Sequence, residues 1–264
     1  MGPVPEGDTI HRLARDQRRD LVGRPVAVSS PQGRFADGAA SIDGRVVDRI
    51  EAHGKHLFQH LDGLIVHVHL GLIGRFRAQP SPPEDPVGEV RLREEGPDRT
   101  WDLSGPQACR LITPDERDEI VDGLGPDPLR RAVDADRVWE GIHRSDRAIG
   151  VLLLDQSVVA GIGNVYRAEL LFLCGIDPRR PGSSLSRGEV DGLWLAARDL
   201  LRRGVRLGRI VTRDPDEVSL PVGRLGEDER LYVYQRSTCR RCGAALSRFP
   251  LGGRTIWACP VCQR

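Results

Sequence analysis

Residues 152–172 read LLLDQSVVAGIGNVYRAELLF, and this stretch decides the fold class of the chain. Apolar runs flank Gly161-Ile162-Gly163, which predicts a helix, a tight turn and a second helix beginning near Asn164. The first N–H groups of a helix have no partners within it, and the helix dipole adds positive charge there. The turn is therefore either an anion-binding site or an ordinary helix–helix connection, and a lone Gly-X-Gly leaves both open.

Four cysteines near the C-terminus form two Cys-X-X-Cys pairs, Cys239 with Cys242 and Cys259 with Cys262. Four thiolates in this pattern close a tetrahedral zinc site without an open position, so we expect one structural Zn²⁺ ion. A redox Cys-X-X-Cys is the alternative, although a redox motif does not come as a matched pair. Between the pairs, LGGRTIW predicts a glycine turn that projects Arg254 outward, a geometry suited to phosphate.

The preceding part of the chain has two other periodicities. Residues 5–23 carry a helical apolar stripe, and residues 44–112 alternate apolar and polar side chains, with a hairpin signal at Asp62-Gly63. We therefore expect an α+β multidomain protein. Its N-terminal domain is a β-sandwich with a leading helix over residues 5–122. A helical domain follows over 123–215, and a zinc-ribbon hairpin over 230–264.

Composition excludes several classes of protein. The 264 residues carry a net charge of only +1, so any polyanion partner has to be met locally, for instance by the arginine-rich end of the chain. No apolar run reaches the ~18 residues of a membrane span. The N-terminus lacks the apolar core of a secretory signal, which favours the cytoplasm. Cys109 and Cys174 lie among apolar residues, and we interpret them as buried thiols.

Lys55, in the stretch EAHGKHL, is the only lysine of the chain, while arginine serves at every other basic position. As surface charges the two residue types are nearly equivalent. They differ in proton chemistry, because an ammonium group can lose its proton near working pH and a guanidinium cannot. A coding bias toward arginine explains Lys55 equally well from this observation alone.

Three separated signals coincide: PEGDT at residues 5–9, DQSVVAGIGNVYRAE at 155–169, and the Cys-X-X-Cys finger with GRTIWACPVCQ. Together they resemble the formamidopyrimidine-DNA glycosylase/endonuclease VIII family of base-excision repair, over essentially all of Pro5–Arg264. PEGDT resembles the endonuclease VIII side. The resemblance implies a β-sandwich, a helix–two-turn–helix domain and a zinc finger, the order expected above. It also implies a monomer in the bacterial cytosol or nucleoid.

The resemblance implies a bifunctional DNA glycosylase and abasic-site lyase acting by β,δ-elimination. Pro5 matches the proline that attacks C1′ of the damaged nucleoside, and Glu6 the glutamate that handles protons. Lys55 matches the family's lysine, which donates or relays a proton, and Arg254 the finger arginine that grips phosphate. An α-amine with a pKa near ~8 is a far better Schiff-base nucleophile at neutral pH than a lysine amine with a pKa of ~10.4.

The implied partner is double-stranded DNA carrying an oxidised base or an abasic site. A damaged base must leave the stack, so another side chain has to fill the gap. Leu72 matches the family's intercalating residue, with Ile73 beside it; a core role for Leu72 is the alternative. Asn164, after Gly163, matches an asparagine that binds the DNA backbone. His69 either contacts phosphate or is a histidine buried in a strand.

The chain departs from the family at two places. Residues 102–107 (DLSGPQ) lack the arginine and phenylalanine of the loop that contacts the orphan base, which puts opposite-base selectivity in doubt. The residues MGPV precede Pro5 and would block its amine, so we expect translation to begin at Val4, read as Met and then removed. If residues 1–4 are retained, a non-catalytic damaged-DNA-binding zinc protein is the alternative. A zinc-ribbon protein adaptor is a third possibility.

Overall fold

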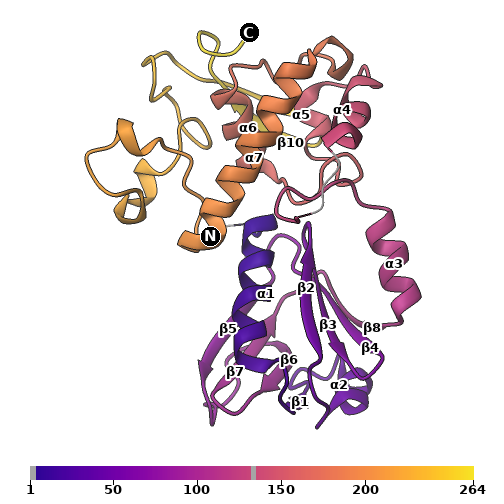
Figure 1. The fold of residues 1–264 in the computed structure, drawn as a ribbon. Coiled ribbons are helices and arrows are strands. Elements are labelled where there is room, and N and C mark those ends of the chain that lie inside the picture. The colour runs from indigo at the N-terminus through magenta and orange to yellow at the C-terminus, as the bar shows by residue number, and fades with distance from the viewer. Residues whose placement is uncertain (1–3, 132–134) are drawn as a thin grey trace. The chain divides into compact units, whose positions relative to one another are not determined.

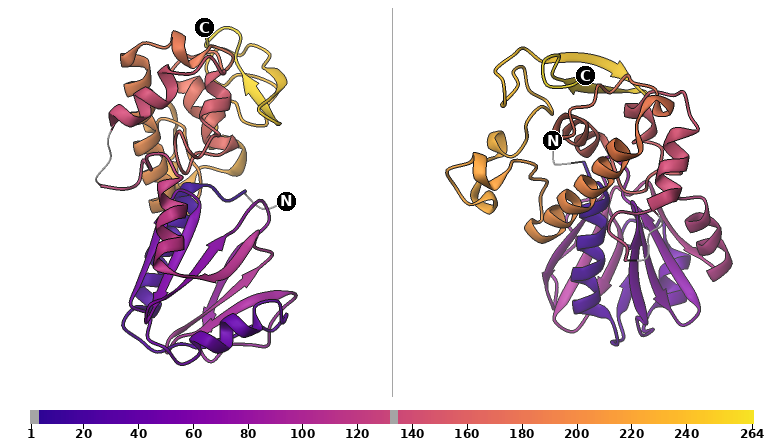
Figure 2. Two further views of the ribbon diagram at one scale, coloured as in Figure 1. Left: turned by 90° about the vertical axis from the view of Figure 1, so that its right-hand side faces the viewer. Right: turned by 45° about the horizontal axis from the view of Figure 1, so that its top comes forward.

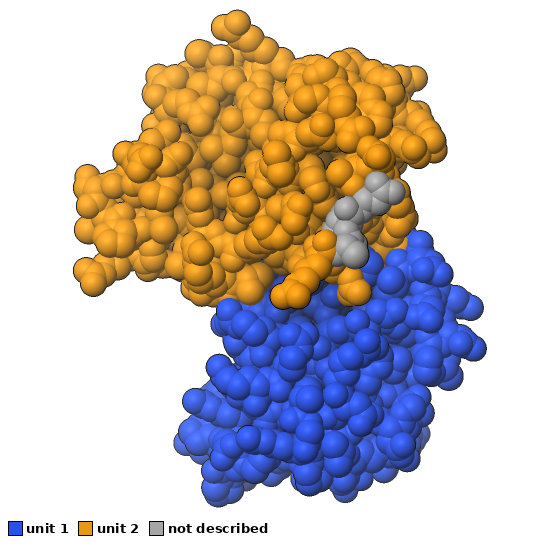
Figure 3. All heavy atoms as spheres, viewed as in Figure 1, with its two compact units in different colours: residues 1–123 blue, residues 124–264 orange. Residues whose placement is uncertain are grey.

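The computed structural model describes residues 4–131 and 135–264 (Figure 1). The chain divides into two compact units, Met1–Gly123 and Leu124–Arg264, which are coloured separately in Figure 3. Each unit has its own hydrophobic core and is described by itself.

Unit 1 is a β-sandwich that begins with helix α1 (Gly7–Leu21). Its two four-stranded sheets have the orders β1-β6-β7-β5 and β2-β3-β4-β8, and all neighbouring strands are antiparallel (Figure 2). The strands are β1 (Ala27–Ser29), β2 (Arg49–His53), β3 (His56–Leu61), β4 (Leu64–His69), β5 (Arg75–Pro80), β6 (Val90–Glu95), β7 (Arg99–Ser104) and β8 (Ala108–Ile112). Two short helices complete the unit, α2 (Ala36–Ile42) and α3 (Pro114–Asp122).

The predicted apolar stripe of the first helix is confirmed. All four of its residues are buried, and α1 packs against strands of both sheets, so the helix lies on the sandwich core. The stripe consists of Ile10, Leu13, Ala14 and Leu21. The predicted hairpin at Asp62-Gly63 is also confirmed, since both residues have positive φ (49° and 80°), as a two-residue turn between twisted strands requires.

Helix α3 was missed by the sequence analysis, although its start carries a clear signal. Thr113 and Glu116 form a reciprocal capping box, and Pro114 stands at the first helical position. The helix has no buried residue and little amphipathic pattern; its apolar contacts with the sandwich come from Ile120 and Val121, and Arg117 forms an ion pair with Glu51 of β2. Cys109 and Cys174, predicted to be buried thiols, are half-buried, and this burial raises their thiol pKa values to about 12 and about 11.

Over residues 124–131 and 135–264, unit 2 combines four helices with a hairpin, and its core cluster runs through both. The helices are α4 (Ala135–His143), α5 (Ile149–Leu152), α6 (Asn164–Leu173) and α7 (Arg187–Leu207), and the hairpin strands are β9 (Ser247–Leu251) and β10 (Arg254–Ala258). Short 3₁₀ turns lie at Gly182–Ser184, Pro215–Glu217, Val222–Arg224 and Glu227–Glu229. The predicted tight turn before α6 is wrong: α5 is a single turn of helix, and residues 153–163 form a longer connection.

A buried carboxylate ties α6 to the segment that enters the cysteine module. Glu169 is fully buried and accepts hydrogen bonds from three consecutive backbone N–H groups, those of residues 232–234, at 2.8 Å each. The hydroxyl of Thr212 donates to the same carboxylate. A carboxylate that receives this many donors is well compensated for its burial, so the α6 glutamate fixes the start of the C-terminal module.

Unit 1 also buries a carboxyl, between its two sheets. Glu94 of β6 is fully buried and accepts a hydrogen bond from Gln59 of β3 at 2.9 Å, and Gln59 donates in turn to Gln17 of α1 at 3.1 Å. In residues 4–131 and 135–264, no basic side chain forms an ion pair with this carboxyl. Desolvation therefore raises the pKa of Glu94 to about 7, although the hydrogen bond from Gln59 acts in the opposite direction.

Glu94→Gln is expected to remove a pH-dependent loss of stability. Because the folded state holds the Glu94 proton more tightly than the unfolded state, the free energy of unfolding falls as pH rises from about 4.5 to about 7. The full penalty above that range is about 3 kcal/mol. Calorimetry at pH 5.5 and pH 8.0 should show the variant gaining stability over wild type mainly at pH 8.0, whereas Glu95→Gln, one residue away, should not. An equal difference at both pH values would contradict this account.

Candidate active site and nucleic-acid interface

Pro5 and Glu6 lie immediately before α1. Pro5 is half-buried, and Glu6 is only 1% exposed. Glu6 is the N-cap residue of α1, yet its side chain makes no capping bond to the helix. Packing of the α1 stripe into the core therefore fixes the helix start, and with it a buried carboxyl next to the proline.

Lys55 lies in the two-residue turn between β2 and β3. The register pairs His53 with His56, so Gly54 and Lys55 form the turn itself. Gly54 has φ 56°, a conformation that costs glycine nothing and other residues about 1 kcal/mol or more. The glycine before the lysine is thus required by the turn that presents Lys55.

The loop after β4 carries the two predicted wedge residues. Leu72 is 61% exposed and Ile73 is 78% exposed, so Leu72 is not part of the core. The exposure of both side chains leaves them available for contact with a bound partner. His69, the last residue of β4, is half-buried, and its Nδ1 accepts a hydrogen bond from the backbone of Gly71 at 3.2 Å.

The loop that departs from the family pattern packs on the wedge loop. A Cβ on Gly71 would lie 2.8 Å from Cβ of Gln107, so this approach requires glycine. The side chain of Gln107 also hydrogen-bonds His69. At the other end of residues 102–107, Asp102 lies within β7, where it is buried and accepts two hydrogen bonds from Arg93, at 2.7 and 2.8 Å. Both ends of residues 102–107 are therefore held by contacts within unit 1.

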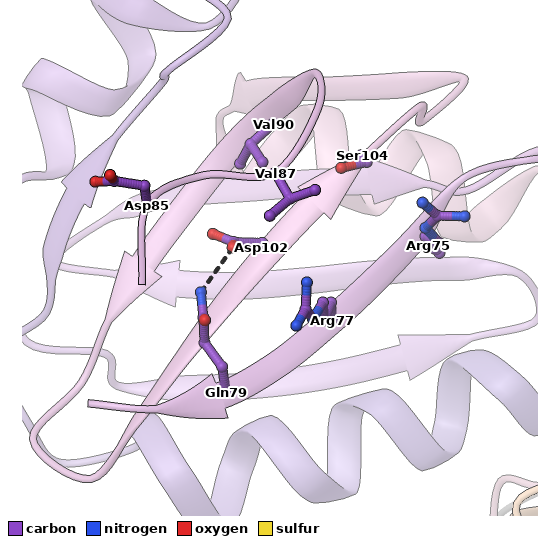
Figure 4. A pocket seen from close by; sticks show the side chains of 8 residues that line it. All are labelled: Arg75, Arg77, Gln79, Asp85, Val87, Val90, Asp102 and Ser104. Carbon is purple, nitrogen blue, oxygen red and sulfur yellow. Dashed lines mark hydrogen bonds between the residues drawn. The ribbon is translucent and has the colours of Figure 1, made fainter. Parts of the chain in front are cut away.

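A polar hollow lies on one face of the sheet that contains β5, β6 and β7 (Figure 4). Its lining residues are Arg75, Arg77, Gln79, Asp85, Val87, Val90, Asp102 and Ser104. Gln79 donates to Oδ2 of Asp102 at 3.0 Å, and Arg93 donates to both oxygens of the same carboxylate. None of the predicted catalytic residues lines this hollow, so it is separate from the candidate active site.

In unit 2, the helical connection and the finger hairpin meet at Asn164. Gly163 is the N-cap of α6, and the side-chain amide of Asn164 donates to the carbonyl of Thr255 at 3.0 Å. Arg167 was missed by the sequence analysis. It is fully buried, donating to the side-chain oxygen of Asn164 at 2.5 Å and to the carbonyl of Leu251 at 2.9 Å. The sequence signal that could have identified Arg167 is an arginine among the apolar residues of this helix.

Arg254 begins β10 directly after the hairpin turn. Gly252 and Gly253 both have positive φ, 64° and 73°, which confirms the predicted glycine turn. Arg254 pairs with Leu251 in the register and is exposed. Asn164 binds the carbonyl of Thr255 in β10, and Arg167 binds the carbonyl of Leu251 in β9. Together they hold both strands of the hairpin next to Arg254.

The four predicted metal ligands are brought together. The sulfur atoms of the four cysteines all lie within 4.8 Å of one another, and the cluster can hold a metal ion. The pairs Cys239–Cys262 and Cys242–Cys259 have sulfur separations of 4.0 and 3.4 Å. A tetrahedron of 2.3 Å zinc–sulfur bonds has edges of about 3.8 Å, which lies between these two values. The donor set therefore fits zinc.

No helix in the described part of the chain has the length and apolar composition to cross a membrane.

Two family models match the chain. The formamidopyrimidine-DNA glycosylase N-terminal domain matches residues 4–105, and the H2TH domain of the same family matches residues 124–216.

Curated relatives match over almost the whole chain. Endonuclease 8 1 of Mycobacterium tuberculosis is 46% identical, over 98% of this chain and 100% of the relative. Formamidopyrimidine-DNA glycosylase of Laribacter hongkongensis is 32% identical, with both chains covered completely. Among solved structures, a complex of Lactococcus lactis Fpg with DNA containing an abasic site has a TM-score of 0.81 at 23% identity, over 98% of this chain and 99% of that chain. This structural likeness concerns the fold.

Proposed function

Because the chain belongs to the formamidopyrimidine-DNA glycosylase/endonuclease VIII family of DNA glycosylases, we propose that it excises oxidised bases and cleaves the resulting abasic site through a Schiff base on Pro5. The observation that carries this proposal is the buried Glu6 carboxyl directly beside Pro5 at the start of α1. An amine nucleophile with an adjacent proton acceptor is the pairing that this chemistry needs.

The reaction begins when the secondary amine of Pro5 attacks C1′ of the damaged nucleoside and the base departs with a proton. The sugar ring opens and an iminium ion forms between Pro5 and C1′. Because the iminium withdraws electrons, loss of a proton from C2′ expels the 3′ phosphate, and a second elimination expels the 5′ phosphate. Glu6 exchanges protons with the sugar during these steps. Hydrolysis of the last adduct regenerates the amine.

Other residues supply protons and hold the DNA. Lys55 donates a proton to the departing base, a role that an arginine cannot share. Arg254 binds phosphate near the lesion, and Asn164, Gly163 and His69 also contact the DNA backbone. Leu72 and Ile73 fill the space left by the flipped base, and the exposure of both side chains supports this role. Zinc in the cysteine cluster builds the finger and takes no part in the chemistry.

Pro5 can act only with a free amine. We propose that the active form begins at Pro5, either because translation starts at codon 4 or because residues 1–4 are removed. An amide nitrogen has no nucleophilic lone pair, so a chain that retains these residues is a damaged-DNA-binding protein instead. N-terminal sequencing of native protein tests this point. Gly2 as the first residue would contradict an internal start.

Arg254→Ala is expected to keep the fold and the metal but to lower strand cleavage at an abasic site about 100-fold, because a phosphate-binding guanidinium is lost. Strand cleavage is measured under single-turnover conditions, and metal content is measured alongside. Arg248→Ala on the neighbouring strand is the matched control, since Arg248 lies 5.8 Å from the Trp257 ring centroid and has no assigned role in the reaction. Unchanged cleavage by the Arg254 variant would remove this residue from the mechanism.

A further inference from the structure

Four rings form a column on one face of the sheet β2-β3-β4-β8. The ring centroids of Phe58 and His67 are 5.1 Å apart, those of His67 and His56 are 5.1 Å apart, and those of His56 and His69 are 4.9 Å apart. The first two contacts are stacked and the third is edge-to-face. The proposed mechanism uses His69 alone among these residues.

Hydrogen bonds fix which nitrogen of each imidazole carries the proton. Arg110 is always a donor, and its Nε donates to Nδ1 of His67 at 3.4 Å. A neutral His67 therefore carries its proton on Nε2, which lies 2.9 Å from Nδ1 of His56. His56 must accept this bond, so its own proton is on Nε2. Nδ1 of His69 accepts from a backbone N–H, and its proton is likewise on Nε2.

Both imidazoles at the centre of the column stay neutral at physiological pH. Burial, together with the charges of the neighbouring histidines and of Lys55, lowers the pKa of His56 to about 3. Burial, followed by the charge of Arg110, lowers the pKa of His67 to about 4. The pair can therefore orient its neighbours without placing another cation beside Lys55.

The column is anchored at one end and reaches the candidate active site at the other. Phe58 is fully buried in a small core with Ile65 and Ile112, and Arg117 of α3 lies 5.6 Å from its ring centroid. Toward the other end, between His67 and His69, His56 is the residue after Lys55 and closes the turn that contains it. Because His67 hydrogen-bonds the ring of His56, it restrains the backbone that carries Lys55.

We propose that His56 and His67 are positioning residues that hold the Lys55 turn in place for proton donation to the departing base. This inference rests on the proposed role of Lys55. A buried polar pair is costly unless hydrogen-bonded, and apolar residues would fill the same space without that requirement. The chain of bonds from Arg110 to His56 supplies a fixed orientation that apolar packing alone does not.

The test is His67→Phe, which keeps a stacked ring but removes the bond to His56. Base release from a duplex with one 5-hydroxyuracil is expected to fall at least about tenfold, since small misplacements of a catalytic group are costly. Cleavage of a preformed abasic site should change less than about twofold, because no base departs there. The matched control is His60→Phe, which lies on the same strand but bonds Glu51 instead of the column. It should leave both activities unchanged.

A second measurement does not depend on activity. Lysine labelled with ¹³C gives a single side-chain signal, because Lys55 is the only lysine. We expect this signal to differ from that of free lysine in wild type and to move toward it in His67→Phe. Arg110→Met, which leaves both imidazoles in place, should move it in the same direction.

The outcomes separate this inference from the proposed function. An unchanged lysine signal in both variants would overturn the positioning role, as would equal losses in base release and abasic-site cleavage with a matching fall in melting temperature. If Lys55→Met retains base release, the proposed role of Lys55 fails, and if wild type releases no base, the proposed function fails instead. The lysine signal then decides whether the histidine pair still positions the turn.

Discussion

A protein prepared with Pro5 as its first residue is expected to cleave an abasic-site duplex, whereas the same protein with residues 1–4 retained is expected to show no cleavage above background. The amine of Pro5 is the nucleophile only when it is not part of a peptide bond. Acylation delocalises the lone pair of the nitrogen into the carbonyl group, so the nitrogen is no longer nucleophilic, while the side chains of the site are unchanged. Single-turnover strand cleavage of the two forms, side by side, measures the difference.

Both forms should bind the abasic duplex with affinities of the same order, because Arg254, Asn164 and the wedge loop are unaltered. DNA binding is therefore the internal control, measured at one fixed salt concentration. Cleavage by the form that retains residues 1–4 would show that Pro5 is not the nucleophile. Loss of binding in that form would show instead that the added residues obstruct the DNA site.

Glu6→Gln is expected to reduce base release by between about 100-fold and about 10,000-fold, the range found for loss of a general acid or base. The amide has nearly the same shape as the buried carboxyl, so packing at the start of α1 is preserved. It cannot accept and return a proton during base loss and ring opening. Base release is followed separately from strand cleavage in single turnovers.

The control for Glu6→Gln is Asp16→Asn on the same helix, where the carboxylate forms surface ion pairs with Arg12 and Arg15. Exposed pairs of this kind contribute little to stability, and this carboxylate has no assigned role in the reaction. We expect wild-type base release from the control. A Glu6→Gln variant with full activity would remove Glu6 from proton transfer and leave that step to another group.

The sequence predicted features that depend on local pattern. The α1 stripe, the Asp62-Gly63 turn and the glycine turn before Arg254 each require residue types that are visible within a short window. The cysteine pairs likewise carry their own spacing, and their sulfurs come together in unit 2. Candidate catalytic residues came from the family resemblance rather than from periodicity.

Features that depend on distant partners were not predictable. The sequence alone gives no reason for a charged side chain at Arg167 on a largely apolar helix. The structure supplies the reason, because Arg167 donates to a carbonyl of the finger hairpin. His56 and His67 are separated by a strand and a turn, and only the β3–β4 register brings their rings together. Glu94 reads as one more acid in an acidic segment, yet the structure buries it against Gln59.

The most direct test of the account is borohydride trapping of native protein on an oligonucleotide with one abasic site, followed by mass spectrometric mapping of the cross-linked residue. The account predicts a covalent adduct on the nitrogen of Pro5, at the terminus of the trapped chain. An adduct on Lys55 would assign the Schiff base to the only lysine amine of the chain and contradict the central claim. The absence of any adduct, with DNA binding intact, would contradict the lyase activity itself.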